Sequence, residues 1–167
     1  MERVRIRYAE AVDAAALNEL YDYYILTTPI TFDLEPWSLA QRLDWLHGFE
    51  TTGPHRILVA EHDGAILGYA SSQRFRDKAA YSTSIETSIY CRQGVTGKGI
   101  GSRLYGALFE ALKGEPIHMA IAGITLPNDA SVAIHERFGF VYAGLNHAVG
   151  RKFERYWDVA WYEKRLD

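Results

Sequence analysis

The sequence is poor in the features that mark several large classes of protein. It holds one cysteine among 167 residues, Cys91, which excludes an intrachain disulfide. The N-terminal segment lacks the apolar run of a signal peptide, so we expect a reducing, cytoplasmic setting. No stretch approaches the ~18 consecutive apolar residues of a membrane-spanning helix, and no association with a membrane is expected.

A concentration of positive charge is also missing. Eighteen Lys and Arg oppose 21 Asp and Glu, and the basic residues are scattered along the chain, so nucleic acid is not an expected partner. The six histidines include no H-E-x-x-H pattern, because no second histidine follows His135 and Glu136 at that spacing, and we predict no metal site. Cys91 has no base at a spacing typical of a nucleophile motif, which favours a packing role.

The chain does contain regular apolar periodicity. Its length and its 48% apolar fraction are those of one globular domain, residues 1–167. Spacings of two and of three to four residues predict an α+β chain. The expected elements are a strand at 4–8, helices at 13–26 and 39–48, strands at 57–61, 65–72 and 81–91, a helix at 102–113, a strand at 117–121, a helix at 130–138, and strands at 140–144 and 157–162. The Asp63–Gly64 pair between two apolar runs predicts a hairpin.

The most informative stretch is the strand at 85–91 with the glycine-dense turn that follows it, residues 93–101. A helix that begins in such a turn exposes backbone N–H groups at the positive end of its dipole, which favours a bound phosphate. Two nucleotide motifs fail on spacing. A P-loop would need a glycine at Arg92 and a hydroxyl at Gly99, and a dinucleotide motif would need a glycine at Ser102. A flexible turn without a ligand is the alternative that these residues leave open.

Gly99 and Gly101 match the two glycines in the pyrophosphate-binding turn of the GNAT superfamily of acetyl-CoA-dependent N-acetyltransferases, which the chain resembles over nearly its whole length. Thr96 departs from that family, where an Arg or Gln usually stands. Four blocks, 86–90, 99–105, 126–136 and 157–159, resemble the branch that acetylates phosphinothricin and methionine sulfone or sulfoximine. The resemblance implies a GNAT fold, a single mixed and mostly antiparallel sheet of about seven strands, flanked by helices and splayed between the fourth and fifth strands.

The resemblance also implies roles for particular residues. Glu86 takes the position of the general base, and His135 that of a group acting as an acid on the leaving thiolate or as a second base. The residues expected to contact acetyl-CoA are Ser88, Ile89, Tyr90, Cys91, Thr96, Gly97, Lys98, Gly99, Ile100, Gly101, Asn128 and Ser131. Phe75, Arg76 and Thr87 are expected to contact the acceptor, with the Arg76 guanidinium on its carboxylate.

The implied reaction moves an acetyl group directly from the co-substrate acetyl-CoA to the primary amine of a small amino-acid-like acceptor. A backbone N–H near Ile89 is expected to hold the oxyanion. Relatives pair as homodimers, and the apolar loop around Ile30, Phe32 and Trp37, which must pack against something, offers a patch. Two alternatives stay open: a GNAT enzyme for a polyamine, aminoglycoside or protein N-terminus, and a non-catalytic acyl-CoA-binding module. Without the resemblance, Glu86 would more often be a solvated charge on a strand.

Overall fold

One seven-stranded sheet organises the computed structural model, which describes residues 4–95 and 97–167. Thr96, a predicted cofactor contact, lies outside the described residues. The strands, in the sheet order β1-β2-β3-β4-β5-β7-β6, are β1 (Arg5–Tyr8), β2 (Arg56–His62), β3 (Ala65–Arg74), β4 (Ser84–Cys91), β5 (Met119–Thr125), β7 (Arg155–Arg165) and β6 (Val141–Lys152). The α-helices are α1 (Ala14–Thr27), α2 (Leu39–Leu46), α3 (Ile100–Ala111) and α4 (Asp129–Arg137).

β1 to β4 are neighbours in the sheet and pair antiparallel. The successive strands β2, β3 and β4 form an antiparallel meander, as their three apolar runs predict. The turn between β2 and β3 holds Asp63 at φ 48° and Gly64 at φ 79°, two residue types that tolerate positive φ. This pair of left-handed residues matches the right-handed twist of the flanking strands, and the predicted hairpin is confirmed.

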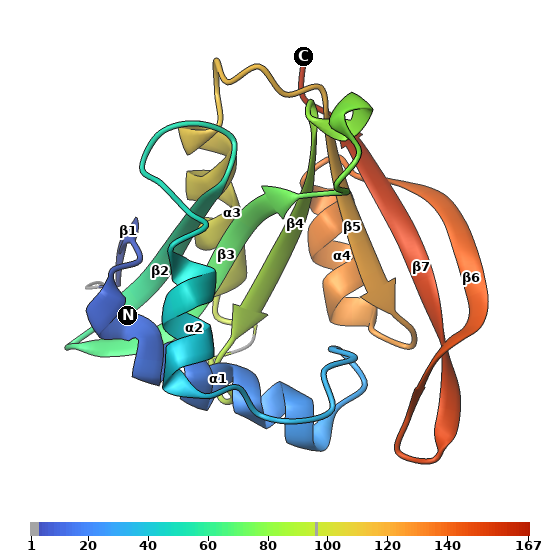
Figure 1. Cartoon of the computed structure of the whole chain (residues 1–167), viewed down its shortest axis with the longest axis horizontal. Helices are drawn as coiled ribbons and strands as arrows, with labels where there is room; N and C mark the ends of the chain where they lie inside the picture. The colour runs from blue at the N-terminus through green and yellow to red at the C-terminus, as the bar shows by residue number, and fades with distance from the viewer. Residues whose placement is uncertain (1–3, 96) are drawn as a thin grey trace.

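β4 and β5 run parallel, and their ladder is short. Three residue pairs join them, from Ser84 opposite Met119 to Glu86 opposite Ile121. Beyond Glu86, β4 continues beside β3 and β5 continues beside β7. Figure 1 shows the two strands diverging from their shared upper end, with α4 behind the gap. The predicted splay between the fourth and fifth strands is confirmed, and we call this opening the fork.

Helices cover both faces of the sheet. α1 and α2 pack on one face, where Leu17 and Leu20 of α1 meet Val59 and Tyr69 of the sheet. α3 covers the other face, where its Leu104 joins the core, and α4 lies on that side too (Figure 1). We call these the α1–α2 face and the α3–α4 face.

Side chains alternate between these faces along β4. Tyr90 packs in the core of the α1–α2 face, so Glu86 and Ser88 share that side. Ile85 and Ile89 pack in the core of the α3–α4 face, and Thr87 lies between them. The predicted acceptor contacts Glu86 and Thr87 therefore point in opposite directions.

The loop between α1 and α2 packs against the β6–β7 hairpin of its own chain. The Phe32 ring fills the space beside Gly150 so closely that a Cβ on this glycine would lie 2.1 Å from a ring carbon. The buried Lys152 ammonium donates to the Thr31 carbonyl oxygen at 2.8 Å. Part of this loop thus packs against its own chain, while Leu34 stays exposed.

Element boundaries differ from the predicted ones for identifiable reasons. A 3-10 helix at Ala79–Tyr81 precedes β4, which begins at Ser84 and not near Tyr81. α3 begins at Ile100, because Gly99 adopts φ 80° at its N-cap. β6 and β7 are longer than predicted, since register shifts after Tyr142 and Asn146 let their ladder continue where the alternation is broken.

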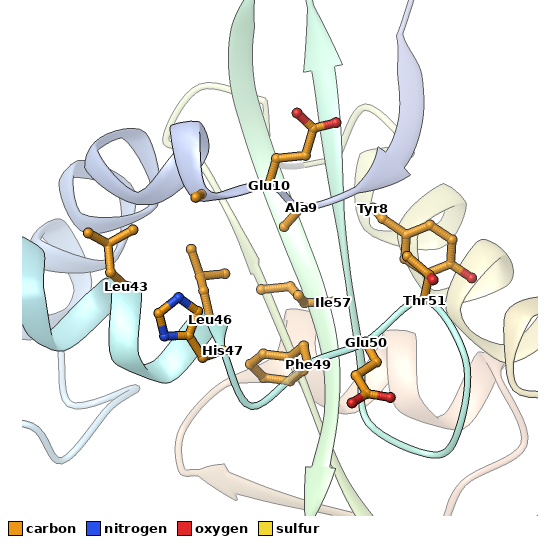
Figure 2. Close-up of a pocket in the computed structure, with 11 residues that line it drawn as sticks. Tyr8, Ala9, Glu10, Leu43, Leu46, His47, Phe49, Glu50, Thr51 and Ile57 are labelled. Carbon is orange, nitrogen blue, oxygen red and sulfur yellow. The ribbon is translucent and has the colours of Figure 1, made fainter.

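A hollow of about 130 Å³ lies away from the fork, between the end of β1 and α2. Figure 2 shows Leu46, Phe49 and Ile57 within it, while the Glu10 and Glu50 carboxylates point away at its ends. None of the predicted site residues lines this hollow, so it is not the candidate site. Among the described residues, no helix has the length and apolar content needed to cross a membrane.

Candidate active site

The candidate site is the fork itself. Seven of the predicted residues line it, and they come from β4 and from α4 and the loop before it: Thr87, Ser88, Ile89, Tyr90, Asn128, Ser131 and His135. Ile30 of the α1–α2 loop and Gly123, Ile124 and Thr125 of β5 complete the lining. The end of the β4–β5 ladder therefore brings together residues that are distant in the sequence.

Glu86 stands at the point where the ladder ends, on the α1–α2 face. Its carboxylate is largely desolvated, and this burial raises the pKa of Glu86 above its ordinary value, with the Arg76 charge acting in the opposite direction. A partly buried carboxyl binds its proton more tightly than one in water. Glu86 is therefore not a fully solvated charge on the strand surface.

An aromatic wall stands near Glu86 on the same face. Trp161 of β7 packs over Gly123, where a Cβ would lie 3.0 Å from the indole ring, and its Nε1 donates to Asn146. The Phe75 ring meets the Trp161 ring edge to face, at 6.5 Å between centroids. The exposed Arg76 guanidinium lies 4.9 Å from the Phe75 ring centroid. The charge of Arg76 acts on Glu86, and the Phe75 ring lies against the same guanidinium.

The α3–α4 face of the fork holds a connected group of polar side chains. Asn128 caps α4 by accepting a hydrogen bond from the Ser131 N–H at 3.2 Å. His135 Nδ1 lies 2.7 Å from the Ser131 carbonyl oxygen, and its Nε2 lies 2.8 Å from the Tyr105 hydroxyl. The Tyr105 hydroxyl also lies 3.3 Å from Thr87 Oγ1.

His135 is buried, with 3% of its surface exposed. Burial lowers the pKa of His135 below its ordinary value, although the bond to the Ser131 carbonyl opposes this shift. Burial thus favours the neutral imidazole, in which one ring nitrogen carries a hydrogen and the other a lone pair. A neutral His135 is a poor match for an acid that must hold its proton before the reaction begins.

The glycine turn leads from the end of β4 to the start of α3. Gly97 and Gly99 both adopt φ 80°, a conformation in which glycine is the favoured residue. The first bond of α3 runs from the Arg103 N–H to the Gly99 carbonyl, so the N–H groups of residues 100–102 precede it and have no partner within the helix. Unpaired N–H groups at a helix N-terminus attract anions, and the exposed Lys98 adds a positive charge beside them.

Two of the residues predicted to contact acetyl-CoA have side chains that do not line the fork. The Ile100 side chain is buried in the core, with 1% exposed, so it offers a ligand only its backbone N–H. Cys91 does not line the fork, and its Sγ lies beside Gly68 and Gly101. Burial raises the pKa of the Cys91 thiol to about 11, which agrees with a packing role.

Sequence reasoning missed Tyr105, Trp161 and Gly123. The sequence pattern assigns Tyr105 to the apolar face of a helix, where its hydroxyl gives no signal of its own. Trp161 and Gly123 meet through the β5–β7 ladder, which no local pattern reveals. Within the described residues, no group of three or more His, Cys, Asp or Glu side chains is arranged to hold a metal ion.

A forked mixed sheet, with a desolvated carboxylate at the fork and a glycine-capped helix N-terminus beside it, is the architecture of an acyltransferase. Comparisons agree. The model of the acetyltransferase (GNAT) family matches residues 17–140. The chain therefore belongs to the GNAT acetyltransferase family, and it is an acetyltransferase with the GNAT fold.

Individual relatives match over nearly the whole chain. A phosphinothricin N-acetyltransferase of Streptomyces coelicolor is 49% identical over 98% of this chain and 96% of its own length. An L-methionine sulfoximine/L-methionine sulfone acetyltransferase of Salmonella typhimurium is 31% identical over 97% of this chain and 94% of its own. The structure of a phosphinothricin acetyltransferase from Sinorhizobium meliloti in complex with acetyl-CoA has a TM-score of 0.88 and 32% identity, covering 98% of this chain and 88% of that chain.

The raised pKa of Glu86 predicts a pH-dependent loss of stability. Below the ordinary Glu pKa the carboxyl is protonated in both folded and unfolded states, so its burial has no ionic cost. As pH rises from the ordinary Glu pKa through the raised folded pKa, the unfolded state gives up its proton first and the free energy of unfolding falls. Above the folded pKa the loss is complete, because the folded state then holds a buried charge. Glu86→Gln removes that charge. We expect the variant to match the wild type near pH 4 and to be more stable at about pH 8.

Urea denaturation at both pH values measures this difference. Glu110→Gln is the matched control, because Glu110 is an exposed carboxylate paired with Lys113 on the surface of α3. Its stability difference from the wild type should not grow between the two pH values in the same way. Equal stability of Glu86→Gln and wild type at both pH values would contradict a desolvated Glu86.

Proposed function

We propose that the protein transfers an acetyl group from acetyl-CoA to the primary amine of a small amino-acid-like acceptor, of the phosphinothricin or methionine sulfoximine and sulfone type. The observation that carries the proposal is the fork. The fork opens a passage between the two faces of the sheet. The α1–α2 face carries Glu86, Arg76 and the aromatic wall, and the α3–α4 face carries the N-terminus of α3. An amine on the first face meets a thioester that reaches the gap from the second.

The start of α3 and the lining of the fork fit acetyl-CoA. The free N–H groups at the start of α3, from Ile100 and Gly101, together with Gly97, Lys98 and Gly99, suit its pyrophosphate. Ser88, Ile89 and Tyr90 line the fork where the pantetheine arm would run, and Asn128 and Ser131 border it from α4. Thr96 belongs to the same proposed phosphate site.

The α1–α2 face fits the acceptor. Arg76 is free to form a bidentate pair with an α-carboxylate, and its own side chain rests against Phe75. The Phe75 and Trp161 rings offer an apolar wall to the acceptor side chain. Thr87 points to the opposite face, so we assign it no direct contact with the carboxylate group that Arg76 binds.

Acetyl-CoA supplies the acetyl group as an activated thioester. Glu86 takes a proton from the acceptor ammonium, directly or through water, and so frees the amine lone pair for attack on the acetyl carbonyl. A backbone N–H of β4 near Ile89 stabilises the negative charge that develops on the carbonyl oxygen. These are the two largest contributions that this chain makes in the proposed reaction, together with alignment of the reactants.

A thiol-release assay with acetyl-CoA and a panel of amines tests the substrate class. We expect the highest kcat/KM for amino acids with a phosphinate, sulfone or sulfoximine side chain. The methyl esters of the same amino acids are matched controls, because they lack the charge that Arg76 pairs with. Faster turnover of a polyamine, an aminoglycoside or a peptide N-terminus would contradict the acceptor class. Acetyl-CoA binding without turnover of any amine would support a sensor instead.

Replacing Glu86 by Gln should lower kcat by about 10²- to 10⁴-fold, the usual contribution of a positioned general base. The change should leave acetyl-CoA affinity near the wild-type value, because Glu86 lies on the opposite face from the start of α3. Steady-state kinetics with isothermal titration of acetyl-CoA separate these effects, and Glu110→Gln again serves as the control. An unchanged kcat would remove Glu86 from the mechanism.

We infer that the chain also forms a homodimer through the β6–β7 hairpin and the adjoining α1–α2 loop. The exposed large hydrophobic residues of these segments support this surface: Phe32, Leu34, Val141, Tyr142, Val149, Phe153 and Tyr156. Light scattering should give twice the 18.9 kDa chain mass, and Tyr142→Glu should shift it toward the monomer. A monomer at all working concentrations would contradict the dimer.

A further inference from the structure

A buried lysine stands outside the roles assigned so far. Lys152 of β6 has 5% of its surface exposed, and its ammonium donates to the Thr31 carbonyl oxygen at 2.8 Å. Burial lowers the pKa of Lys152, and the charge of Asp33 opposes that shift. An ammonium is costly to bury unless polar or charged groups compensate. Here the α1–α2 loop supplies both the carbonyl oxygen and the carboxylate.

The residue that accepts from Lys152 is also bonded from α1. The Tyr21 hydroxyl donates to the Asp33 carboxylate at 2.7 Å. Tyr21 has only one hydroxyl proton, so Thr31 is the donor in the 2.6 Å contact between their two hydroxyls. Thr31 Oγ1 in turn accepts from the Asp33 N–H at 3.2 Å. Thr31 is thus bonded to β6 through its carbonyl and to α1 through its hydroxyl.

A close packing contact adjoins these bonds. The Phe32 ring lies on Gly150, where a Cβ would be 2.1 Å from a ring carbon, so any side chain at residue 150 must displace the ring. Gly150 is two residues before Lys152 on the same strand. We call Thr31, Phe32, Gly150 and Lys152 the loop anchor. It joins the α1–α2 loop to β6 through one polar contact and one apolar contact.

The residue before the loop anchor lines the fork. Ile30 forms part of the fork lining, and its side chain also packs against the core of the α1–α2 face. Consecutive Cα atoms are about 3.8 Å apart, so a fixed Thr31 restricts where Ile30 can lie. The β6–β7 hairpin therefore sets the position of one part of the fork wall.

We propose that Lys152 is a positioning residue whose bond to Thr31 holds Ile30 at the fork, on the side that receives the acceptor. The inference rests on the proposed function, because that function assigns the acceptor to the α1–α2 face. Lys152 is absent from the described lining of the fork, so it acts through the loop. A loop that is already ordered need not be ordered by the acceptor, which leaves more of the binding free energy for affinity.

Two variants release the loop in different ways. Lys152→Met removes the ammonium and keeps an unbranched side chain, so it deletes the bond to Thr31 and leaves most of the packing. Gly150→Ala keeps the ammonium but introduces a Cβ that displaces the Phe32 ring. A common effect of the two variants would therefore arise from the loop.

Each variant has a matched control. Lys113→Met makes the same substitution at an exposed lysine, which pairs with Glu110 on the surface of the molecule. Gly144→Ala makes the same substitution at another glycine of β6, where a Cβ would meet nothing within 4 Å. Both controls should match the wild type in the two measurements that follow.

Hydrogen–deuterium exchange of the free protein, followed by mass spectrometry, reads the loop without any substrate. In Lys152→Met we expect the peptide that covers residues 28–38 to exchange about tenfold faster, the size of one lost hydrogen bond to a charged group. Gly150→Ala should raise the exchange of the same peptide. The Asp33 N–H, which is bonded to Thr31 Oγ1, belongs to it. Peptides from β2 and β3 should keep their wild-type rates.

Steady-state kinetics with the best amine of the panel read the consequence for the acceptor. In both variants the KM for the acceptor should rise about fivefold, because binding must then order the loop. The kcat and the KM for acetyl-CoA should stay near the wild-type values, since Glu86 and the start of α3 are unchanged.

Wild-type exchange of the loop in both variants would overturn the inference. Faster exchange spread evenly over the chain would overturn it too, because that pattern reports a loss of overall stability. Faster loop exchange with an unchanged acceptor KM would overturn the link between the loop and the acceptor. A wild type that turns over no amine would instead contradict the proposed function, and the exchange rates would then decide the loop anchor by themselves.

Discussion

The parallel ladder between β4 and β5 ends after three residue pairs, and the geometry of the site depends on that early end. Strands paired further along would occupy the backbone groups of β4 and close the passage between the two faces. Close packing beside the fork favours the open form. A Cβ on Gly101 would lie 2.9 Å from Ile134 of α4 and 3.3 Å from Ile89 of β4. The absence of a side chain at residue 101 thus lets the start of α3 reach the fork while α4 stays behind the gap.

The α1–α2 face is held in position by a buried cation. Arg42 is 1% exposed, and its guanidinium carbon lies 4.2 Å from the Trp37 ring centroid and 4.6 Å from that of Trp45. Its Nε donates to Asn18 at 2.8 Å. Burial of a guanidinium is costly unless other groups compensate, and aromatic rings at these distances do so in part. One side chain of α2 therefore ties together α1, the loop that closes on the β6–β7 hairpin, and the aromatic residues under the acceptor face.

Short-range sequence patterns predicted the features that depend on neighbouring residues, such as helix ends. Ser38 caps α2 through the predicted reciprocal bonds with Gln41, and Asn128 caps α4. Resemblance to a family gave the splay and most of the fork lining, which no periodicity could supply. Contacts between distant elements were out of reach, as the Tyr105–His135 bond illustrates, because a tyrosine on an apolar helix face looks like core until its partner is known. The alternation of side chains along a strand, however, is enough to place Glu86 and Thr87 on opposite faces of the sheet.

Desolvation shifts the pKa values of Glu86 and His135 in opposite directions, and both shifts favour the uncharged form. It raises the pKa of Glu86 and lowers the pKa of His135. An acceptor ammonium bound near Glu86 would lower the pKa of that carboxyl again, since an opposite charge stabilises the ionised form. A carboxylate on the same acceptor would engage Arg76 and weaken the influence of that guanidinium on Glu86. In the proposed reaction the ammonium of the acceptor favours ionised Glu86, while its carboxylate acts in the opposite direction through Arg76. An amine without a carboxylate would exert only the first effect.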